Sequence, residues 1–457
     1  MKKYVFIFFT IFILLSIAII SYSNPKTNAD ILKEADQNPL NCAYFITSNL
    51  KTGNRRVVFK QIAINFSKLG EYDLAIQIAN QQIEEYDGTI EAALMGILDN
   101  CISSGKTEYV STLLPQIVQI AEKSNSASLL TKVAVIAYDF GQKNEALKYL
   151  NNAYNQAKMN PKDETNYRDL VLIDVVEGYA KIGQYEKANE VVSAVSKTYK
   201  QSALSKIALE YGNKKDYDYA LQMISKLESD TFKATALTEL ADKYICAGLT
   251  ADAAGLLNQS YQLLIKAEDS FGKIVYMNNI ARLFNKIGDT NKALDIVNMS
   301  LEESKTIENQ NTKDSALEKI AISYGSIGQH ERALKVIDTM QSPEWKIYGL
   351  TRVAASSDQS KAVSFTNKAF QIANAMGNNN ISFKDVALLE VAIGYGEVGL
   401  LVEAVKTVKL ISSDFRKAQA LADIGLAYQR AGMNSDEVKT ILYEIIKGQS
   451  VVGKGKK

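Results

Sequence analysis

The sequence predicts an all-α solenoid built from stacked helix-turn-helix hairpins. Three observations predict this fold: a glycine that recurs in a fixed frame, apolar residues at helical spacing before it, and an alanine at a fixed distance after it. The repeats lie 32 positions apart at the closest (Val175 to Ile207) and 42 at the widest (Val133 to Val175). Internal periods of about 20 to 50 residues are typical of repeat architectures, in which each element packs mainly on its neighbours.

The composition excludes several functional classes. The 457 residues carry 52 basic and 51 acidic side chains, whereas a nucleic-acid-binding surface requires a clear basic excess. One histidine and three cysteines leave too few ligands for a zinc site, a histidine-based triad or a disulfide framework. We therefore expect no enzyme activity, no cofactor, no metal site and no nucleic-acid partner.

Residues 1–23 are predicted to be a signal peptide or an N-terminal membrane anchor. A Met-Lys-Lys start precedes the apolar residues 4–20, as in export signals. This run is longer than a signal core of about 7–15 residues and short for a spanning helix of about 20, so cleavage after Ser23 and retention both fit. Because the lysine pair holds the N-terminus inside, the rest of the chain is expected outside the cytoplasm. It would be secreted, periplasmic or anchored, touching the membrane only through residues 4–20 if these are uncleaved.

Residues 24–55 are predicted to cap the solenoid, with residues 42–50 forming one helix. Residues 56–447 hold the repeats, each with an aliphatic anchor. The eleven anchors are Ile62, Ile97, Val133, Val175, Ile207, Leu240, Ile280, Ile320, Val353, Val391 and Ile424. Nine repeats have a glycine eight residues after the anchor, and those at Ile207 and Val353 lack it. Residues 448–457 are predicted to be a flexible basic tail.

The positions around each anchor predict the two helices of a hairpin. Leucine usually lies three residues before the anchor and an aromatic residue four after it, so all three fall on one face of a helix. The glycine ends this helix in the left-handed conformation. Alanine usually follows the anchor directly, which allows a second helix to approach closely. Another alanine, five residues after the glycine, belongs to that second helix.

The pattern resembles the tetratricopeptide repeat. Between Leu317 and Ala333 it reads Leu-x-x-Ile-Ala-x-x-Tyr-x-x-x-Gly-x-x-x-x-Ala, and the resemblance covers roughly residues 56–447. Leucine replaces the early tryptophan of the family, and the closing proline is absent. The resemblance implies a right-handed superhelix whose first helices line a concave, protein-binding surface.

The position two residues after each anchor is the candidate binding surface, since it is expected on the concave side. It holds Ile64, Asp99, Val135, Glu177, Leu209, Asp242, Arg282, Ile322, Ala355, Ile393 and Leu426. The candidate partner-binding residues are Asp99, Glu177, Asp242, Arg282, Ile322 and Ile393. The aliphatic members predict either an apolar groove for a helix or extended peptide, or burial between neighbouring repeats.

Three other features are interpreted structurally. The string from Gly394 to Gly399 matches the dinucleotide fingerprint, but it lies at the end of a predicted first helix rather than after a strand. His330 is predicted to be a solvated turn residue. Cys101 occupies an aromatic position of the frame and is predicted to be a buried free thiol, although a bridge to Cys42 is left open.

These features predict an exported scaffold that binds a protein or peptide through the concave face of its solenoid. Two alternatives remain open. A carbohydrate-binding or carbohydrate-active solenoid would need exposed aromatic residues and converging acids on that face. An architectural spacer would show no binding preference there.

Overall fold

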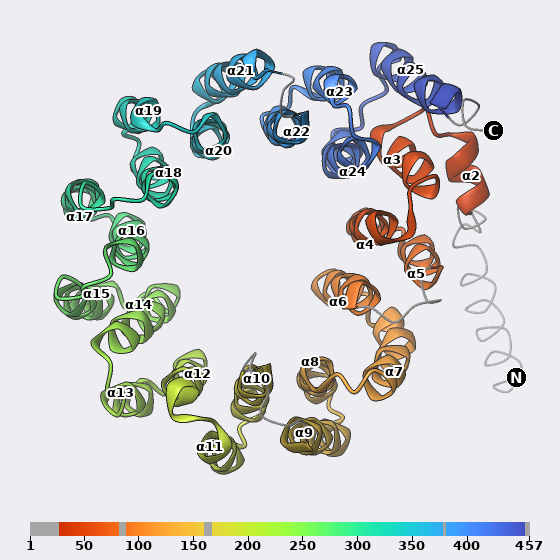
Figure 1. Ribbon diagram of the computed structural model, residues 1–457. Coiled ribbons are helices and arrows are strands. Elements are labelled where there is room, and N and C mark those ends of the chain that lie inside the picture. The colour runs from red at the N-terminus through yellow and green to blue at the C-terminus, as the bar shows by residue number, and fades with distance from the viewer. Residues whose placement is uncertain (1–26, 82–87, 160–166, 378–380, 453–457) are drawn as a thin grey trace, which may run out of the picture. The chain divides into compact units, whose positions relative to one another are not determined.

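The computed structural model describes residues 27–81, 88–159, 167–377 and 381–452 (Figure 1), and these residues form 24 helices and no strand. The prediction of an all-α solenoid of TPR-like hairpins is confirmed. The predicted signal or anchor, residues 1–23, lies outside the described residues. The chain divides into two compact units, one of residues 1–109 with 413–457 and one of residues 110–412. They are called unit 1 and unit 2.

Unit 2 is an array of hairpins whose first helices follow one another along one side and whose second helices lie on the other (Figure 1). The first helices are α8 (Ala127–Asp139), α10 (Tyr167–Lys181), α12 (Lys197–Asn213), α14 (Asp230–Cys246), α16 (Ser270–Lys286), α18 (Gln310–Ser326), α20 (Pro343–Ala354) and α22 (Ile381–Glu397). The second helices are α9 (Lys143–Met159), α11 (Tyr185–Ala194), α13 (Tyr217–Ser225), α15 (Thr250–Leu264), α17 (Thr290–Ser304), α19 (His330–Thr339), α21 (Gln359–Ala375) and α23 (Leu401–Leu410). Helix α7 (Thr107–Lys123) spans the division between the units.

Unit 1 contains helices from both ends of the chain. They are α2 (Asn28–Lys33), α3 (Pro39–Ser48), α4 (Thr52–Lys68), α5 (Tyr72–Asn80), α6 (Gly88–Ser103), α24 (Asp414–Arg430) and α25 (Asp436–Val452). Helix α3 forms within the predicted cap and begins three residues before the expected helix. Helix α25 continues to Val452, so its last turns enter the segment expected to be a tail.

The recurring glycines end the first helices as expected. All nine have φ between 60° and 90° (Gly432 and Gly288 at the extremes), the left-handed region in which a Cβ atom is unfavourable. In the repeat anchored at Ile207, Lys215 occupies the glycine position and takes the same conformation, with φ 63°. The turn therefore imposes the conformation, and this lysine adopts it at a cost.

A tyrosine–asparagine hydrogen bond joins neighbouring hairpins at the aromatic position. In three repeats the tyrosine hydroxyl of a first helix donates to an asparagine on the preceding second helix, at 2.7 to 2.8 Å. The pairs are Tyr179 with Asn151, Tyr324 with Asn298, and Tyr395 with Asn367. The rings are buried, so the bond satisfies a hydroxyl that burial would otherwise leave without a partner.

Where the second helix is short, a side-chain to backbone hydrogen bond recurs after it. Six residues before the anchor, an acceptor side chain in the first helix binds backbone N–H groups just before the next first helix. These bonds run from Ser196 to Asp169, from Glu228 and Ser229 to Gln201, from Gln341 and Ser342 to Asp314, and from Ser412 to Asp385. The second helices concerned, α11, α13, α19 and α23, have only 9 or 10 residues.

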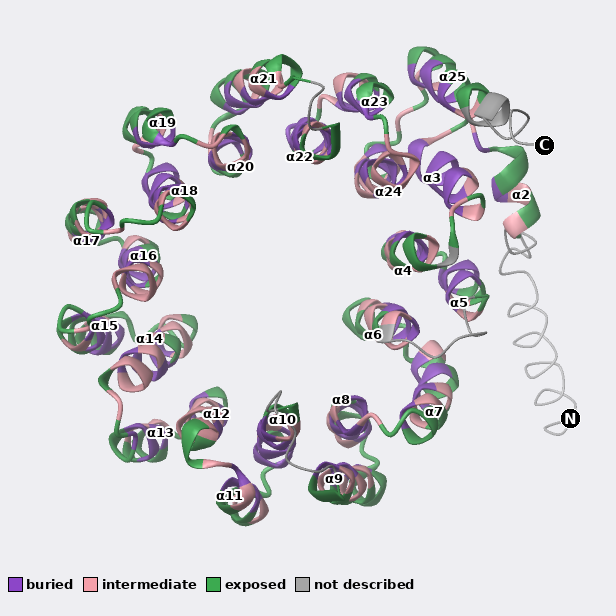
Figure 2. Cartoon of the chain, in the orientation of Figure 1, coloured by how far each residue is buried: buried purple, intermediate pink, exposed green. Residues whose placement is uncertain are grey.

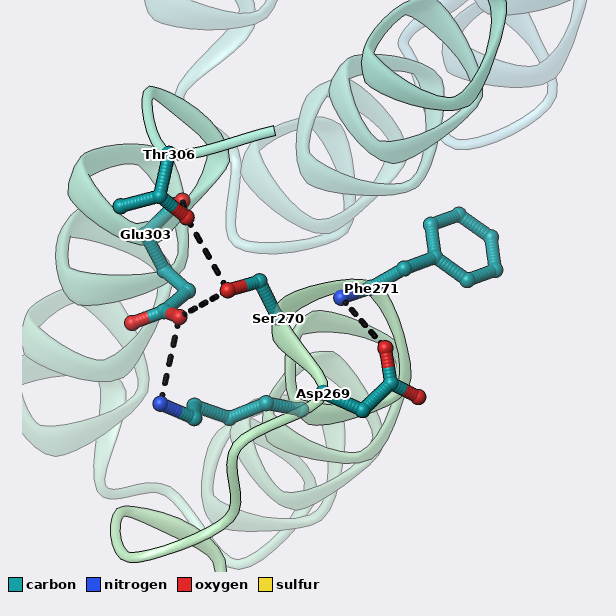
Figure 3. Close-up of polar contacts among 6 residues, drawn as sticks. Asp269, Ser270, Phe271, Glu303 and Thr306 are labelled. Carbon is teal, nitrogen blue, oxygen red and sulfur yellow. Dashed lines mark hydrogen bonds and ion pairs between the residues drawn. The ribbon is translucent and has the colours of Figure 1, made fainter. Parts of the chain in front are cut away.

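In the longer α16–α17 hairpin, polar side chains join the start of α16 to the end of α17 (Figure 3). Ser270 Oγ donates to Glu303 Oε1 at 2.6 Å, and Lys273 Nζ lies 3.2 Å from the same oxygen. Both charged side chains are less than one quarter exposed, with 12% for Lys273 and 23% for Glu303. The pair is therefore better shielded from solvent than a surface ion pair.

The fingerprint-like string has packing roles in the last turn of α22 and the turn after it. A Cβ atom on Gly394 would lie 3.1 Å from Cγ2 of Thr351 on the neighbouring first helix. Tyr395 makes the hydrogen bond to Asn367, and Gly399 has φ 79°. The repeat frame thus accounts for the residues that resemble a nucleotide loop.

Helix α3, at the start of the chain, completes the last hairpin. It packs on α24 as extensively as α17 packs on α16 within one hairpin. A Cβ atom on Gly425 would lie 2.7 Å from the backbone nitrogen of Leu40, so the two helices approach more closely than an alanine would allow. Among the described residues, α25 packs on α3. Helix α3, rather than α25, therefore occupies the second-helix position beside α24.

Candidate functional site

The candidate surface is the first-helix side, defined by the position two residues after each anchor. None of these eleven side chains is buried: Asp99, Arg282 and Ala355 are exposed, and the other eight are half-buried. The expectation that the aliphatic members are buried between neighbouring repeats therefore does not describe them. Figure 2 shows the contrast with the buried faces that the first helices turn toward their second helices.

Five of the six candidate binding residues lie on first helices of unit 2. Glu177 is on α10, Asp242 on α14, Arg282 on α16, Ile322 on α18 and Ile393 on α22. The sixth, Asp99, lies on α6 in unit 1 and is exposed. The five residues therefore belong to the surface of unit 2, and Asp99 belongs to unit 1.

Glu177 is held between two lysines from adjacent first helices. Its carboxylate lies 2.6 Å from Lys181 Nζ and 2.8 Å from Lys206 Nζ. Burial raises the pKa of Glu177, but the hydrogen bonds and charges of the two lysines outweigh burial and lower it overall. Glu177 thus remains ionised and links α10 to α12.

Asp242 is also paired across first helices, whereas Arg282 is not. Lys286 Nζ on α16 donates to Asp242 Oδ1 on α14 at 2.8 Å, and this hydrogen bond raises the pKa of Lys286. Arg282, one turn earlier on α16, is exposed and has no ion pair among the described residues. Of the charged candidates in unit 2, Arg282 is the one available to an acidic group of a partner.

Ile322 and Ile393 lie beside further charges. Arg352, on the first helix between them, has a guanidinium nitrogen 3.7 Å from Glu390 Oε2 on α22. Burial raises the pKa of Glu390, and Arg352 offsets only part of that effect. Half-buried aliphatic side chains and paired charges therefore alternate along this part of the surface.

The flanking charges occupy a position that the sequence interpretation missed. Lys206, Glu239, Lys319, Arg352 and Glu390 each directly precede an anchor, in a position that is polar in ten of the eleven repeats. The position lies three residues before the candidate position and shares its helix face. A polar residue that recurs beside an apolar anchor was the signal that could have found it.

A groove lies on the opposite, second-helix side, lined by α13, α14 and α15. Its volume is about 620 Å³, and Leu221, Leu237 and Leu263 contribute to its apolar lining. Lys233 and Lys266 also line it, and neither has an ion pair among the described residues. The groove is therefore a second surface of unit 2, and its contribution to partner binding can be compared with that of the first-helix side.

The one histidine and the three cysteines of the chain lie on different helices. His330 begins α19, and both ring nitrogens are buried without a hydrogen-bond partner, so the expectation of a solvated residue was wrong. Burial lowers its pKa. Cys42, Cys101 and Cys246 are free thiols, and Cys101 is buried as predicted.

Within the described part of the chain, no group of three or more histidine, cysteine, aspartate or glutamate side chains is arranged to hold a metal ion. In the same residues, no helix is both long and apolar enough to cross a membrane.

Comparisons with known proteins found distant similarity to solved structures. No family model and no curated protein matches the chain. Among solved structures, Ton1535 from Thermococcus onnurineus is 17% identical, with 79% of this chain and 98% of that one covered and a TM-score of 0.29. A Rap protein complexed with competence and sporulation factor is 14% identical, with 86% and 99% covered and a TM-score of 0.29. Yeast Tom70 is 13% identical, with 85% and 99% covered and a TM-score of 0.18.

Such low TM-scores carry no argument about function. The assignment as a TPR-like helical solenoid therefore stands on the chain's own repeat frame, helix order and left-handed glycines.

Proposed function

We propose that this chain is an exported scaffold that binds a protein segment along the first-helix side of unit 2, the concave side in solenoids of this type. The observation that carries the proposal is the exposure of the candidate positions. Eleven repeats present a side chain there, and the fold buries none of them. A surface of half-buried aliphatic residues and charges suits a segment with both apolar and charged side chains.

Residue types on this side favour a scaffold over a carbohydrate-binding solenoid. The candidate position and the position directly before the anchor contain no aromatic residue in any repeat. Sugar binding of the expected kind would require exposed aromatic rings there. Two acids at the candidate position in unit 2, Glu177 and Asp242, are engaged in ion pairs with lysines rather than converging on each other.

The decisive experiment compares two exposed cations on opposite sides of unit 2. Arg282→Glu changes the first-helix side, and Lys266→Glu changes the second-helix groove; neither residue has an ion pair among the described residues. Proteins bound to the tagged chain would be cross-linked in the intact envelope and identified by mass spectrometry. We expect Arg282→Glu to reduce the yield of a specific protein and Lys266→Glu to leave it unchanged.

The opposite dependence would place the partner on the second-helix side. Loss of cross-linked protein in neither variant, although the wild type is cross-linked, would contradict recognition through this surface and favour a spacer. Equal melting temperatures of the two variants are the control for folding.

Export is tested independently of binding. We expect an added protease to degrade the tagged chain while the cytoplasmic membrane stays closed, either directly or once an outer barrier is opened. Sequencing the N-terminus of the purified protein distinguishes cleavage after Ser23 from a retained anchor. Degradation only after lysis of the cytoplasm would contradict export.

A further inference from the structure

The contact between the two chain ends in unit 1 has the pattern of a repeat-to-repeat contact. Within the array, a first helix packs on its own second helix and on the next first helix, and the second helix also packs on that next first helix. Helices α24, α3 and α4 follow the same pattern, in this order. Helix α3 is thus the second helix of the last repeat, and α4 is the first helix of the following one.

A buried polar contact also joins α4 to α24, which packs beside it. Asn65 Nδ2 on α4 donates to the carbonyl of Ala422 on α24 at 2.7 Å, in a buried position. Asn100, which has the same place in its repeat, donates to the carbonyl of Ile64 on α4 at 3.4 Å. Both asparagines thus donate to the backbone of the preceding first helix, although Ala422 lies two residues before its anchor and Ile64 lies two residues after its anchor.

Helix α3 is enclosed by this contact. Leu40, Cys42 and Ile46 are fully buried, and most of the other residues of the helix are buried as well. A helix that is buried on almost every side is held by neighbours all around it, here α24, α4, α25 and α2. The contact is therefore a core of the molecule.

The connection between the two sides is unlike that of any other hairpin. Leu40 and Gly425 are 385 positions apart (425 minus 40), whereas the two helices of α14 and α15 are separated by residues 247–249. No short turn requires that α3 and α24 belong to the same molecule. A head-to-tail contact of this kind closes within one chain or joins successive copies, as in domain swapping.

We propose that this contact, with α3 and α4 on one side and α24 and α25 on the other, is a self-association site of the chain. It closes within one molecule at low concentration, because the two sides are then linked. When the two sides separate, each accepts the complementary side of a second copy. Helices α3 and α4 move together, since residues 49–51 alone connect them.

Two full-length variants test the proposal by complementation. Gly425→Leu places a side chain against the backbone of Leu40 and blocks the α24 side, while its α3 side remains intact. Leu40→Asp places a charge in the core and blocks the α3 side, while its α24 side remains intact. A mixture of the two still contains one intact pair of sides. Light scattering should show a heterodimer in the mixture and monomers in each variant alone.

Cys42 reports whether the sides have separated in each variant. Peptide mapping after iodoacetamide treatment distinguishes it from Cys101, which is also buried, and from the exposed Cys246. We expect Gly425→Leu to increase the labelling rate of Cys42 by about tenfold or more, as a local opening would, without a comparable change at Cys101. Gly255→Leu on α15, where a Cβ atom meets nothing within 4 Å, is the matched control.

Two results would overturn the proposal. One is a mixture that stays monomeric although Cys42 is labelled rapidly in both variants, because open sides that do not join are not an association site. The other is Cys42 that stays protected in Gly425→Leu, because α3 would then not depend on α24. Equal labelling of Cys101 in all variants confirms that the neighbouring repeats remain folded.

Discussion

The α14–α15 hairpin and the α24–α3 pair have similar packing but different connections. In the first, Ser260 Oγ on α15 donates to the carbonyl of Ala234 on α14 at 2.7 Å, and a three-residue turn joins the helices. In the second, Gly425 takes the small-residue position of the frame and Leu40 comes from the other end of the chain. The comparison shows that two helices of this fold pack as a hairpin without a short turn between them.

Truncation of one leucine in each region tests the comparison with the largest expected effect. Leu40 on α3 and Leu257 on α15 are both fully buried. Replacing either by alanine should cost about 2–5 kcal/mol, the usual range for a buried leucine. Hydrogen exchange should show lost protection in α3 and α24 for Leu40→Ala, and in α14 and α15 for Leu257→Ala. Loss confined to α3 would contradict the pairing with α24.

Removing a buried acceptor sharpens the comparison between repeats. Asp314 is fully buried and accepts hydrogen bonds from Gln310 and from the backbone N–H groups of Gln341 and Ser342. Asp314→Ala leaves these donors without a partner and should lower the free energy of unfolding by roughly 1–3 kcal/mol. Asp314→Asn keeps one acceptor oxygen and should lose less in chemical denaturation. Equal losses in the two variants would contradict a capping role.

A stabilising substitution tests the turns that close ordinary hairpins. Lys215 has φ 63° in the position where nine other repeats have glycine. Lys215→Gly should raise stability by about 1 kcal/mol, because glycine adopts this conformation without the steric cost of a Cβ atom. Lys215→Ala keeps the Cβ atom and is the control. A gain in melting temperature for alanine as large as that for glycine would attribute the effect to the lysine charge.

The smallest expected effect is a pH dependence at α19. Because burial lowers the folded-state pKa of His330, the unfolded chain binds the proton more readily. Stability should therefore fall as the pH decreases through the unfolded pKa of about 6.5. His330→Gln should reduce this slope in melting curves recorded from neutral to mildly acidic pH. An unchanged slope would show that other groups cause it.

The sequence predicted what is local and periodic. Anchors, glycines and alanines recur within each hairpin, so the helices and their turns followed from spacing alone. The side chains that accept hydrogen bonds six residues before an anchor were missed, because a polar residue such as Asp385, near the start of a helix, looks like an ordinary solvated residue. Its buried role depends on the length of the second helix that follows.

The pairing of α3 with α24 was missed for a different reason. No spacing rule connects residues 385 positions apart, and α3 lacks the glycine that marks the other hairpins. A trace was present in the last repeat, where Gly425 replaces the usual alanine and Glu437 and Val438 depart from the frame. These departures fit a first helix whose own following helix, α25, packs elsewhere.

Native-state hydrogen exchange on the unmodified chain tests the central claim most directly. If α3 completes the last repeat, its amides and those of α24 should open with the same free energy, despite their separation in the sequence. Helices α14 and α15 provide the reference for a connected hairpin. Exchange of α24 together with α25, at a free energy different from that of α3, would contradict the account.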